Sequence, residues 1–321
     1  MKNKIIILSG DPNSINSELI FKCWKKINIK IKNKIFLISN YDLIKQQLKK
    51  LNYSIDLIKV NNINEKVEGD KLKLIHIDLN FKNPFNVPLE PTSKFITKSL
   101  NLAHILGLNK EVKGILNCPI NKKLLKKNNI GVTEFFASKC NIKNDSEVML
   151  IRNNKLSVSP LTTHLDIKDV SKRINKKMII KKIETINIWF TKIFKKKPKI
   201  AVLGLNPHNA ELRSNSEEVK IIIPAIKHLK KVGMKIYGPI VSDTFFINEF
   251  KNFDVVLGMY HDQVLSPFKS LFKFDAINIT LGLKYLRVSP DHGTATDIIG
   301  KNKANSTSLL KCINFIDKFG K

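Results

Sequence analysis

Three of the seven histidines share one setting, because each lies just past the C-terminal end of an apolar run typical of a strand. The histidines are His164, His208 and His261, and the runs before them are Leu156–Thr162, Lys199–Leu205 and Asp254–Tyr260. In open α/β sheets, the carboxyl ends of the strands meet at the ligand crevice. Three neutral imidazoles there can bind one divalent cation and leave positions open for a substrate. Each histidine taken alone could equally be a hydrogen-bonded loop residue, so the spacing raises a metal site as a hypothesis.

Carboxylates follow two of these histidines, since Asp166 comes two residues after His164 and another comes directly after His261, and a third lies before His261 in the chain. Asp262 directly follows His261, and Asp243 lies in a Ser-Asp-Thr sequence. Carboxylates in such places can orient imidazoles or move protons. Asp243 has an ordinary alternative role, since Ser-Asp-Thr often begins a helix. We take Asp243 and Asp262 as the candidate catalytic residues.

Three side chains downstream of His261 suit an anionic substrate. Lys269 and Arg287 can clamp a phosphate or carboxylate, the arginine in bidentate fashion. Arg287 is the more informative of the two, because arginine is scarce in this lysine-rich chain. Asn278 lies in an apolar strand pattern, where its amide must find a partner.

A polar segment bounded by glycine, Asp291–Gly300, leads toward the last helical pattern of the chain. The chain has no Gly-x-Gly-x-x-Gly sequence, which is the usual dinucleotide fingerprint. A nicotinamide cofactor would therefore have to bind in another way.

The charge balance is strongly basic. Lysine and arginine number 56 against 27 acidic residues, a formal net charge of +29 in 321 residues. Nearly all of the positive charge is lysine, spread along the chain among many Ile and Asn residues, as a compositionally biased genome would produce. Charge alone supports only non-specific attraction to nucleic acid, so we expect no specific nucleic-acid partner.

The cysteines and the N-terminal sequence indicate a compartment. Four cysteines stand far apart without a Cys-x-x-Cys pair, which argues against a zinc ribbon or a disulfide framework and fits a reducing environment. The apolar run Ile5–Leu8 is too short for a signal peptide, and no later run could span a bilayer. We expect a cytoplasmic protein without membrane contact.

Short apolar runs alternate with longer helical patterns, which predicts an α/β fold with a mostly parallel sheet. The predicted strands are Lys4–Leu8, Lys34–Ser39, Ser54–Val60, Lys73–Ile77, Val112–Asn117, Glu147–Arg152, Leu156–Thr162, Lys199–Leu205, Asp254–Tyr260 and Ala276–Leu281. The predicted helices are Ile15–Ile27, Tyr41–Leu51, Thr92–Leu108, Val170–Phe194, Ser216–Val232 and Ser306–Phe319. Leu156–Thr162 is expected to form a hairpin with the strand before it. Asn305 or Ser306 is the expected cap of the last helix.

Ordered blocks along nearly the whole chain resemble one enzyme family. They are Gly10-Asp11-Pro12, Cys118–Lys122, Thr133-Glu134-Phe135, Leu161–His164, Gly204–His208, Gly238-Pro239 with Asp243-Thr244, Met259–Gln263, Asn278–Leu283 and Asp291–Ala295. Through these blocks the chain resembles the 4-hydroxythreonine-4-phosphate dehydrogenases of vitamin B6 synthesis. That family is similar in fold to the isocitrate and isopropylmalate dehydrogenases, which implies a two-lobed α/β/α sandwich.

The resemblance implies a reaction and a set of site residues. The reaction is NAD-dependent and metal-dependent oxidation of 4-phosphohydroxy-L-threonine to a β-keto acid, which decarboxylates to 3-amino-2-oxopropyl phosphate in pyridoxal phosphate biosynthesis. The implied metal ligands are His164, His208 and His261, in a site shared between the two chains of a homodimer. The implied substrate contacts are Thr133, Lys269, Asn278 and Arg287. The implied NAD site is lined by His292, Gly293, Thr294, Ala295, Asp297 and Asn305.

The same similarity implies two domains. Residues 1–119 plus 262–321 would form the nucleotide-side domain, and residues 120–261 a second α/β domain with the metal ligands and dimer contacts. The cation could be zinc, magnesium or cobalt, because imidazoles accept several metals. The cofactor could be NAD or NADP.

The chain departs from the family pattern in two places. Val132 stands where the family carries a histidine that helps to bind substrate, and valine cannot donate a hydrogen bond. Ser14, Asn16 and Ser17 stand where the opening loop of the family carries glycines and a proline. Two alternatives therefore stay open: a related dehydrogenase of another phosphorylated hydroxy acid, such as a threonate or erythronate phosphate, and a catalytically impaired homologue.

Overall fold

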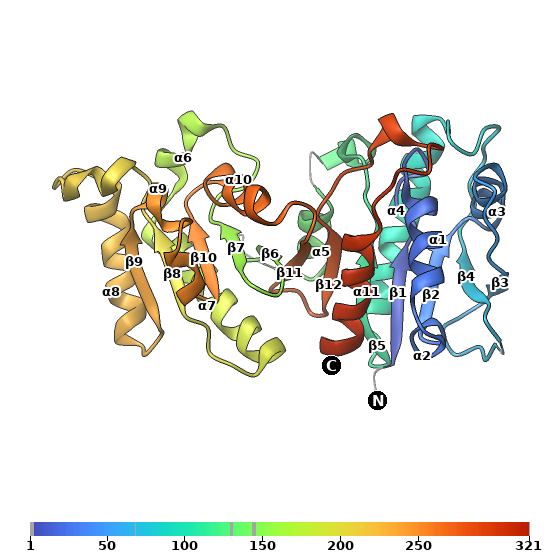
Figure 1. Ribbon diagram of the computed structural model, residues 1–321, viewed down its shortest axis with the longest axis horizontal. Helices are drawn as coiled ribbons and strands as arrows, with labels where there is room; N and C mark the ends of the chain where they lie inside the picture. The colour runs from blue at the N-terminus through green and yellow to red at the C-terminus, as the bar shows by residue number, and fades with distance from the viewer. Residues whose placement is uncertain (1–2, 68, 129–130, 143–145, 321) are drawn as a thin grey trace. The chain divides into compact units, whose positions relative to one another are not determined.

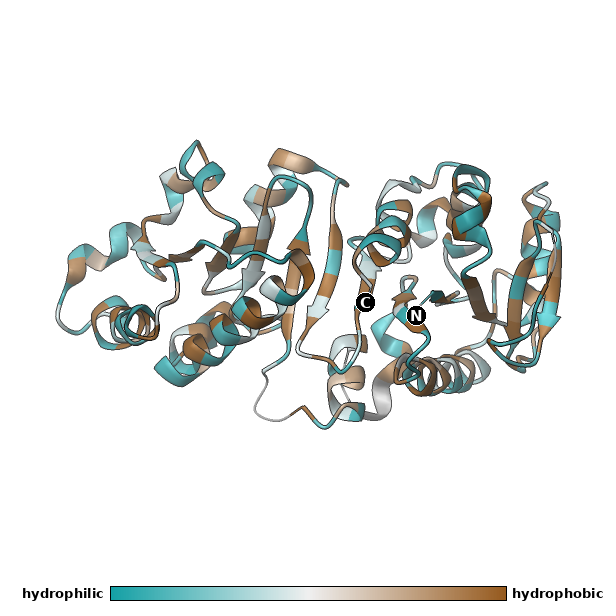
Figure 2. Cartoon of the chain, turned by 90° about the horizontal axis from the view of Figure 1, so that it is seen from below, coloured by the Kyte–Doolittle hydropathy of each residue, from teal (hydrophilic) through white to brown (hydrophobic). Residues whose placement is uncertain are grey.

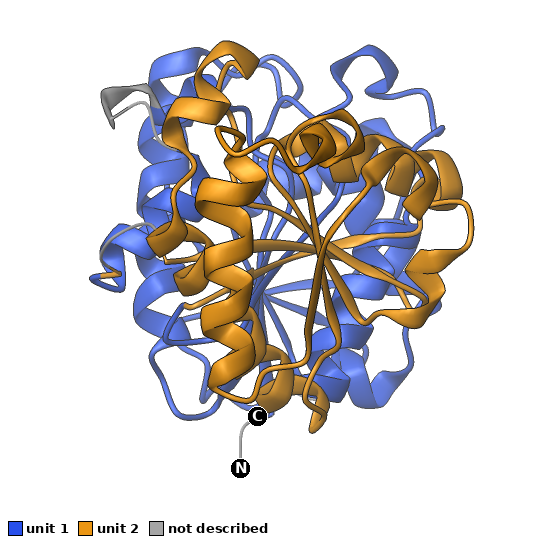
Figure 3. Cartoon of the chain, turned by 90° about the vertical axis from the view of Figure 1, so that its left-hand side faces the viewer, with its two compact units in different colours: residues 1–141, 283–321 blue, residues 142–282 orange. Residues whose placement is uncertain are grey.

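The computed structural model describes residues 3–67, 69–128, 131–142 and 146–320. The chain forms two compact units, unit 1 with residues 1–141 and 283–321 and unit 2 with residues 142–282 (Figure 3). Both boundaries lie further along the chain than the predicted ones, so that residues 120–141 belong to unit 1 and residues 262–282 to unit 2. The reason is packing, because the turn after residue 121 packs on a helix of unit 1 and the helix after residue 260 packs on strands of unit 2.

Unit 1 is a parallel sheet covered by helices (Figure 1). Its strands run in the order β3-β4-β2-β1-β5-β12, and the register pairs within it are parallel. The strands are β1 (Lys4–Leu8), β2 (Ile35–Ser39), β3 (Leu57–Val60), β4 (Leu72–His76), β5 (Val112–Asn117) and β12 (Arg287–Pro290). The helices are α1 (Asn16–Lys26), α2 (Ile29–Lys32), α3 (Tyr41–Lys50), α4 (Leu89–Gly107), η1 (Lys122–Asn128), α5 (Val132–Lys139), η5 (Thr296–Ile298) and α11 (Thr307–Phe319).

Helices cover both faces of this sheet, as two adjacent residues of β5 show. A Cβ on Gly107 of α4 would lie 2.6 Å from the side chain of Ile115, and a Cβ on Gly114 would lie 3.1 Å from Ile316 of α11. Neighbouring strand residues point to opposite faces, so α4 and α11 pack on opposite sides of β5. Burial on both faces explains why β1 and β2 are nearly continuous runs of Ile, Leu and Phe.

Unit 2 has a mixed sheet in the order β11-β6-β7-β10-β8-β9. The pairs β11–β6 and β6–β7 are antiparallel, whereas β7–β10, β10–β8 and β8–β9 are parallel. The strands are β6 (Val148–Arg152), β7 (Ser157–Pro160), β8 (Ile200–Leu203), β9 (Ile236–Ile240), β10 (Val255–Gly258) and β11 (Ile277–Leu281). The helices are α6 (Ile167–Arg173), α7 (Lys176–Phe194), η2 (Pro207–Leu212), η3 (Glu218–Ile222), α8 (Ile223–Lys231), α9 (Ser242–Phe245), η4 (Glu249–Asn252) and α10 (His261–Phe272).

The cores follow the hydrophobic pattern of the strands. Figure 2 colours the strands as largely hydrophobic, whereas hydrophilic and hydrophobic residues alternate along the helices. In unit 2, Phe245 and Phe268 pack with Val256 of β10 and Leu203 of β8 in one buried cluster. The predicted α/β fold with a mostly parallel sheet is confirmed. Within the described ranges, no helix combines the length and hydrophobicity that crossing a bilayer requires.

The predicted hairpin is confirmed, with β6 and β7 antiparallel and the Asn153 side chain accepting bonds from the next turn. The predicted helix Val170–Phe194 is wrong, because the chain breaks at Ile174 and the Asn175 side chain then caps α7 by accepting from Met178 N at 2.9 Å. Helix Ser216–Val232 proves to be a π-helical turn, η3, followed by α8.

Among the elements that the sequence analysis did not predict, two strands and one helix bear on the site. Strand β9 contains the cis Gly238-Pro239 peptide and is only partly buried. Strand β12 buries Arg287 and Ser289, so its polar residues hide the strand pattern. Helix α10 was not predicted, and it carries Pro267 inside.

An ion pair ties the C-terminal helix to the sheet of unit 1. Asp317 of α11 accepts a hydrogen bond from Lys34 Nζ at 2.7 Å and lies 3.3 Å from Lys113 Nζ of β5. Burial disfavours its charged form, but the hydrogen bond from Lys34 and the charges of both lysines outweigh this effect and hold the pKa of Asp317 below its usual value.

We predict that Asp317→Asn lowers the free energy of unfolding by about 1 kcal/mol at pH 7. A depressed folded-state pKa gives stability that is present above the unfolded value of about 3.9 and is lost as pH falls through the folded value. The difference between wild type and variant, measured by urea unfolding, should therefore shrink toward pH 3. Asp56→Asn, at an exposed carboxylate, is the control. A cost that does not change with pH would contradict this account.

Candidate functional site

Two of the three predicted metal ligands meet at the ends of neighbouring strands. His164 lies in the loop after β7, and His261 is the first residue of α10, directly after β10. Strands β7 and β10 pair in parallel, and the loops that follow are joined by Thr162, whose hydroxyl donates to Met259 O at 2.8 Å. The imidazole centroids of His164 and His261 lie 6.0 Å apart at an interplanar angle of 36°. Two imidazoles on one cation span about 5–6 Å between centroids, so this pair can share an ion.

His208 lies past the end of β8, the other neighbour of β10, in a left-handed turn. All five residues from His208 to Leu212 have positive φ, between 46° and 56°. This conformation costs about 1–2 kcal/mol per residue, so other contacts must hold the turn. The His208 Nε2 atom lies 3.7 Å from Asp243 Oδ2, and Nδ1 lies 3.5 Å from Glu211 Oε1.

The structure does not bring the third histidine into a ligand cluster with the other two. Among the residues that it describes, no group of three or more His, Cys, Asp or Glu side chains is close enough to hold a metal ion. His164 and His261 therefore stand together, and His208 stands with Asp243.

Both candidate catalytic carboxylates contact a histidine. Asp262 Oδ1 lies 2.7 Å from His261 Nδ1, an arrangement that orients the imidazole and leaves Nε2 as the ligand atom. Asp243 lies on the short helix α9, where its Oδ1 accepts from Thr244 N at 2.7 Å while Oδ2 faces His208. Asp243 thus lies at the start of a helix, as its sequence suggested, and also faces a histidine.

Buried side chains fasten the loops that carry His208 and His261. Gln263 accepts from Met259 N at 2.6 Å and donates to Gly204 O at 2.7 Å, which links the end of β10 to the end of β8. Glu218, fully buried at the start of η3, accepts from the backbone N–H groups of Leu205 and Asn206, each at 2.8 Å.

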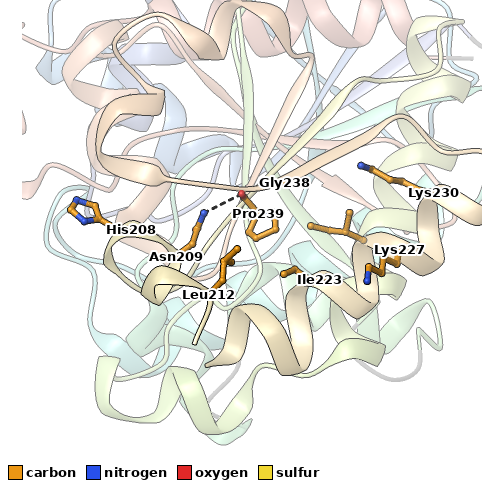
Figure 4. Close-up of a pocket in the computed structure, with 9 residues that line it drawn as sticks. His208, Asn209, Leu212, Ile223, Lys227, Lys230, Gly238 and Pro239 are labelled. Atoms are coloured by element: carbon orange, nitrogen blue, oxygen red, sulfur yellow. Dashed lines mark hydrogen bonds between the residues drawn. The ribbon is translucent and has the colours of Figure 1, made fainter. Parts of the chain in front are cut away.

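A cavity of about 440 Å³ adjoins the left-handed turn (Figure 4). It is lined by His208, Asn209, Leu212, Ile223, Ile226, Lys227, Lys230, Gly238 and Pro239. Asn209 Nδ2 donates to Pro239 O at 3.1 Å, a bond that connects the turn with β9. The size lies within the usual range for small-molecule sites.

The predicted substrate residues of unit 2 lie on two elements. Lys269 is exposed on α10, and Asn278 is partly buried on β11. The Asn278 Oδ1 atom is buried without a hydrogen-bond partner. An unsatisfied buried amide oxygen is costly, and this is the property expected of a group reserved for a ligand.

In unit 1, the structure brings Thr133 and Arg287 together. The buried guanidinium of Arg287 donates from Nε to Asn117 Oδ1 at 2.7 Å and from Nη1 to Thr133 Oγ1 at 3.2 Å. Burial lowers the pKa of Arg287 to about 10, opposed chiefly by the charge of Glu134. The arginine therefore remains cationic at neutral pH and can attract an anion.

The predicted cofactor segment of unit 1 packs against the opening loop. Thr294 O accepts from Ile15 N at 3.2 Å, and a Cβ added at Gly293 would meet no atom within 4 Å. The remaining members are His292 and Ala295 beside them, Asp297 in η5, and Asn305, whose Oδ1 accepts from Thr307 N at 2.9 Å. That bond makes Asn305, and not Ser306, the side chain that caps the start of α11.

The polar residues that stand in place of the family's glycines hold the opening loop together. Ser14 Oγ donates to Asp11 O at 2.5 Å, and Asn16 Nδ2 donates to Pro119 O at 2.9 Å. A Cβ on Gly10 would lie 2.6 Å from Asn16 Nδ2, so Asn16 occupies the space beside a glycine with φ of +72°. Asn16 Oδ1 and Ser17 Oγ are buried without partners.

Sequence reasoning missed Asn117, Gln263 and Glu218 as site residues. Asn117 ends an apolar strand, so the strand-end pattern that found the histidines would have found it too. Gln263 directly follows Asp262, yet nothing marks its amide as a bridge between loops. Glu218 lies in the first turn of a predicted helix, where an acidic residue is ordinary.

We predict that Asn117→Leu lowers the free energy of unfolding by about 2–3 kcal/mol, because it removes an acceptor of the buried Arg287 guanidinium. Urea unfolding of the two proteins measures the difference. Asn101→Leu, at a partly exposed amide on α4 that bonds Thr97 O, is the matched control and should cost less than about 0.5 kcal/mol. Equal losses in the two variants would contradict a role for Asn117 in holding Arg287.

Comparison with known proteins finds relatives along nearly the whole chain, among them a putative D-threonate 4-phosphate dehydrogenase of Oceanobacillus iheyensis that is 31% identical over 96% of this chain and 95% of that protein. The family described as pyridoxal phosphate biosynthetic protein PdxA matches residues 31–316. The 4-hydroxythreonine-4-phosphate dehydrogenases of Aquifex aeolicus (strain VF5) and Sulfurihydrogenibium sp. (strain YO3AOP1) are 41% and 36% identical, covering 99% and 97% of this chain and 98% and 96% of those proteins. The crystal structure of 4-hydroxythreonine-4-phosphate dehydrogenase from Klebsiella pneumoniae superposes with a TM-score of 0.84 at 27% identity, covering 99% of each chain. The chain belongs to the PdxA family.

Proposed function

We propose that this protein is a metal-dependent 4-hydroxythreonine-4-phosphate dehydrogenase. It oxidises 4-phosphohydroxy-L-threonine with NAD or NADP to a β-keto acid, which loses carbon dioxide to give 3-amino-2-oxopropyl phosphate for pyridoxal phosphate biosynthesis. The observation that carries the proposal is the 6.0 Å approach of the His164 and His261 imidazoles, at adjacent strand ends, in a chain of the PdxA family. Relatives named for this activity match the chain over nearly its full length.

The residues present fit a divalent cation. His164 and His261 offer two converging imidazoles, and Asp262 fixes the orientation of the second. His208 is the proposed third ligand, since its strand β8 is the next neighbour of β10. Imidazole donors favour zinc or cobalt over magnesium. When bound, such a cation lowers the pKa of a coordinated hydroxyl and stabilises negative charge on oxygen.

The chain's own side chains would bind the substrate and move its proton. The cationic Arg287, with the Thr133 hydroxyl beside it, would bind an anionic group of the substrate. Lys269 and Asn278 are the proposed contacts in unit 2, the latter through its unsatisfied amide oxygen. Asp262 or Asp243, each beside a histidine, would accept the hydroxyl proton.

The nicotinamide cofactor is proposed to bind at residues 292–297 and Asn305. The segment contains a glycine with open space beside it and touches the opening loop, whose Asn16 Oδ1 and Ser17 Oγ are buried without partners. These groups are suited to the hydroxyl and amide groups of a dinucleotide.

We further propose a homodimer whose active site lies at the subunit interface. Large apolar side chains beside the histidines support it, because Ile167 and Leu212 are 71% and 56% exposed. Contiguous exposed apolar surface marks interaction sites, so these two side chains are the proposed start of such a surface beside the histidines. A second copy of the chain would cover them.

We predict that the purified protein, supplied with zinc or cobalt and NAD, reduces NAD when given 4-phosphohydroxy-L-threonine. His208→Ala and His261→Ala should each abolish NADH formation and reduce bound metal, measured by elemental analysis. His228→Ala, at an exposed histidine of α8, is the control and should keep both. Full activity of both ligand variants would remove the metal from the mechanism, whereas tight metal without turnover in the wild type would favour an impaired homologue.

We predict that Val132→His raises kcat/KM for 4-phosphohydroxy-L-threonine by about tenfold, because an imidazole at the first position of α5 can donate a hydrogen bond to an anion. Initial rates with this substrate and with threonate and erythronate phosphates measure the preference. If the wild type prefers threonate or erythronate phosphate and the substitution reverses this preference, the protein is a related dehydrogenase and not a 4-hydroxythreonine-4-phosphate dehydrogenase.

A further inference from the structure

A buried carboxylate, that of Glu218, holds the segment that leads into the left-handed turn with His208. The five residues of the turn, His208–Leu212, follow Pro207 and occupy a backbone region that L-residues avoid. The chain on its own would not keep this conformation. Contacts with other parts of the fold must therefore hold it, and one comes from inside the turn, where Asn209 Nδ2 donates to Pro239 O at 3.1 Å. The others are made by the segment just before the turn.

Glu218 makes those contacts from a distant point in the sequence. Its side chain is fully buried, and its Oε1 accepts from Leu205 N and Asn206 N at 2.8 Å each. Its Oε2 accepts from Asn206 Nδ2 at 3.0 Å. Three donors from two consecutive residues leave the segment before the turn little freedom to rotate.

The local backbone around Glu218 is also unusual. Glu218 opens η3, a π-helical turn of five residues, before α8 begins at Ile223. π-Helical turns are rare overall, and those that occur are often found at functional sites. Here the turn lies where the carboxylate meets the loop.

The charge of this carboxylate is secured by its surroundings. Burial disfavours the charged form, but hydrogen bonds from Asn206 and Leu205 outweigh burial and lower the pKa of Glu218. Hydrogen bonds to a charged acceptor are stronger than those to a neutral one.

Glu217 provides a comparison on the same turn. Its Oε2 also accepts from Asn206 Nδ2, at 2.8 Å, but its side chain is partly exposed and bonds no backbone N–H of the loop. The two neighbouring glutamates therefore differ in their contacts with the loop, since only Glu218 accepts hydrogen bonds from its backbone N–H groups.

We propose that Glu218 is a positioning residue for His208. By holding Leu205 and Asn206, it limits how far the His208 ring, which stands apart from His164 and His261 in this structure, can move as a metal ligand. The inference rests on the proposed function, because it takes His208 to be a ligand. Residues that orient a metal ligand are worth about 10–100-fold in metal affinity.

The test compares Glu218→Gln with Glu217→Gln in the full chain. Zinc affinity is measured by competition with a chelator, and amide hydrogen exchange of residues 205–212 is measured without metal. Glu218→Gln should weaken zinc binding by about 10–100-fold and speed exchange at Leu205 and Asn206, with other regions unchanged. Glu217→Gln should stay within about twofold of the wild type, since it loses one bond to a side chain.

Two further variants make each outcome decisive. If Glu218→Gln does not fold, Glu218→Asp keeps the charge but shortens the reach, and it should show the same local exchange and weaker zinc binding. If the Glu218 variants match Glu217→Gln in hydrogen exchange and zinc affinity, the inference is overturned. If His208→Ala nevertheless loses zinc, the proposed function still stands. Unchanged zinc affinity in His208→Ala would overturn both, because His208 would not be a ligand.

Discussion

The parallel pairing of β7, β10 and β8 is the constraint on which the candidate site depends. Parallel neighbours end at the same edge of a sheet, so the loops after these strands must lie side by side. Each of the three loops carries a histidine, and Thr162 and Gln263 join the loops by hydrogen bonds to main-chain groups. The imidazoles of His164 and His261 are close because their strands are neighbours, although 97 residues separate the bonded Thr162 and Met259.

Buried charge is the second constraint, and three buried charged side chains each bond two or more partners, although Glu18 Oε2 is buried without one. Arg287 reaches Asn117 and Thr133, and Glu218 receives two backbone N–H groups and one amide. Glu18, 1% exposed, binds Lys22 Nζ at 2.7 Å and Ala304 N at 2.7 Å, which fastens the segment after the proposed cofactor residues to α1. Desolvating a charge is expensive unless such bonds replace water. The large surplus of lysine is not needed for these arrangements and lies mostly on exposed positions.

Two loops of this fold have unusual local structure. One is the left-handed turn at His208, and the other is the opening loop, whose polar side chains bond its own backbone. The turn stores an unfavourable backbone that Glu218 and Asn209 hold in place through contacts with other elements. In the opening loop, Ser14 and Asn16 form the bonds that a glycine-rich sequence would leave to ligands or water. Both segments lie beside residues proposed to bind metal or cofactor, where strain and unsatisfied groups are expected to gather.

The sequence by itself determined the α/β class, nearly all of the strongly apolar strands, the hairpin and the positions of the candidate ligands, because these depend on local patterns of hydrophobic residues. It missed β12, since Arg287 and Ser289 are buried through partners remote in sequence, and it merged α6 with α7 across a break that the Asn175 cap decides. Only the tertiary structure decided that His164 and His261 meet, that His208 stands apart in a left-handed turn, and that Glu218 holds that turn. The physical reason is that these facts rest on strand order and on hydrogen bonds between distant segments, which no local pattern encodes.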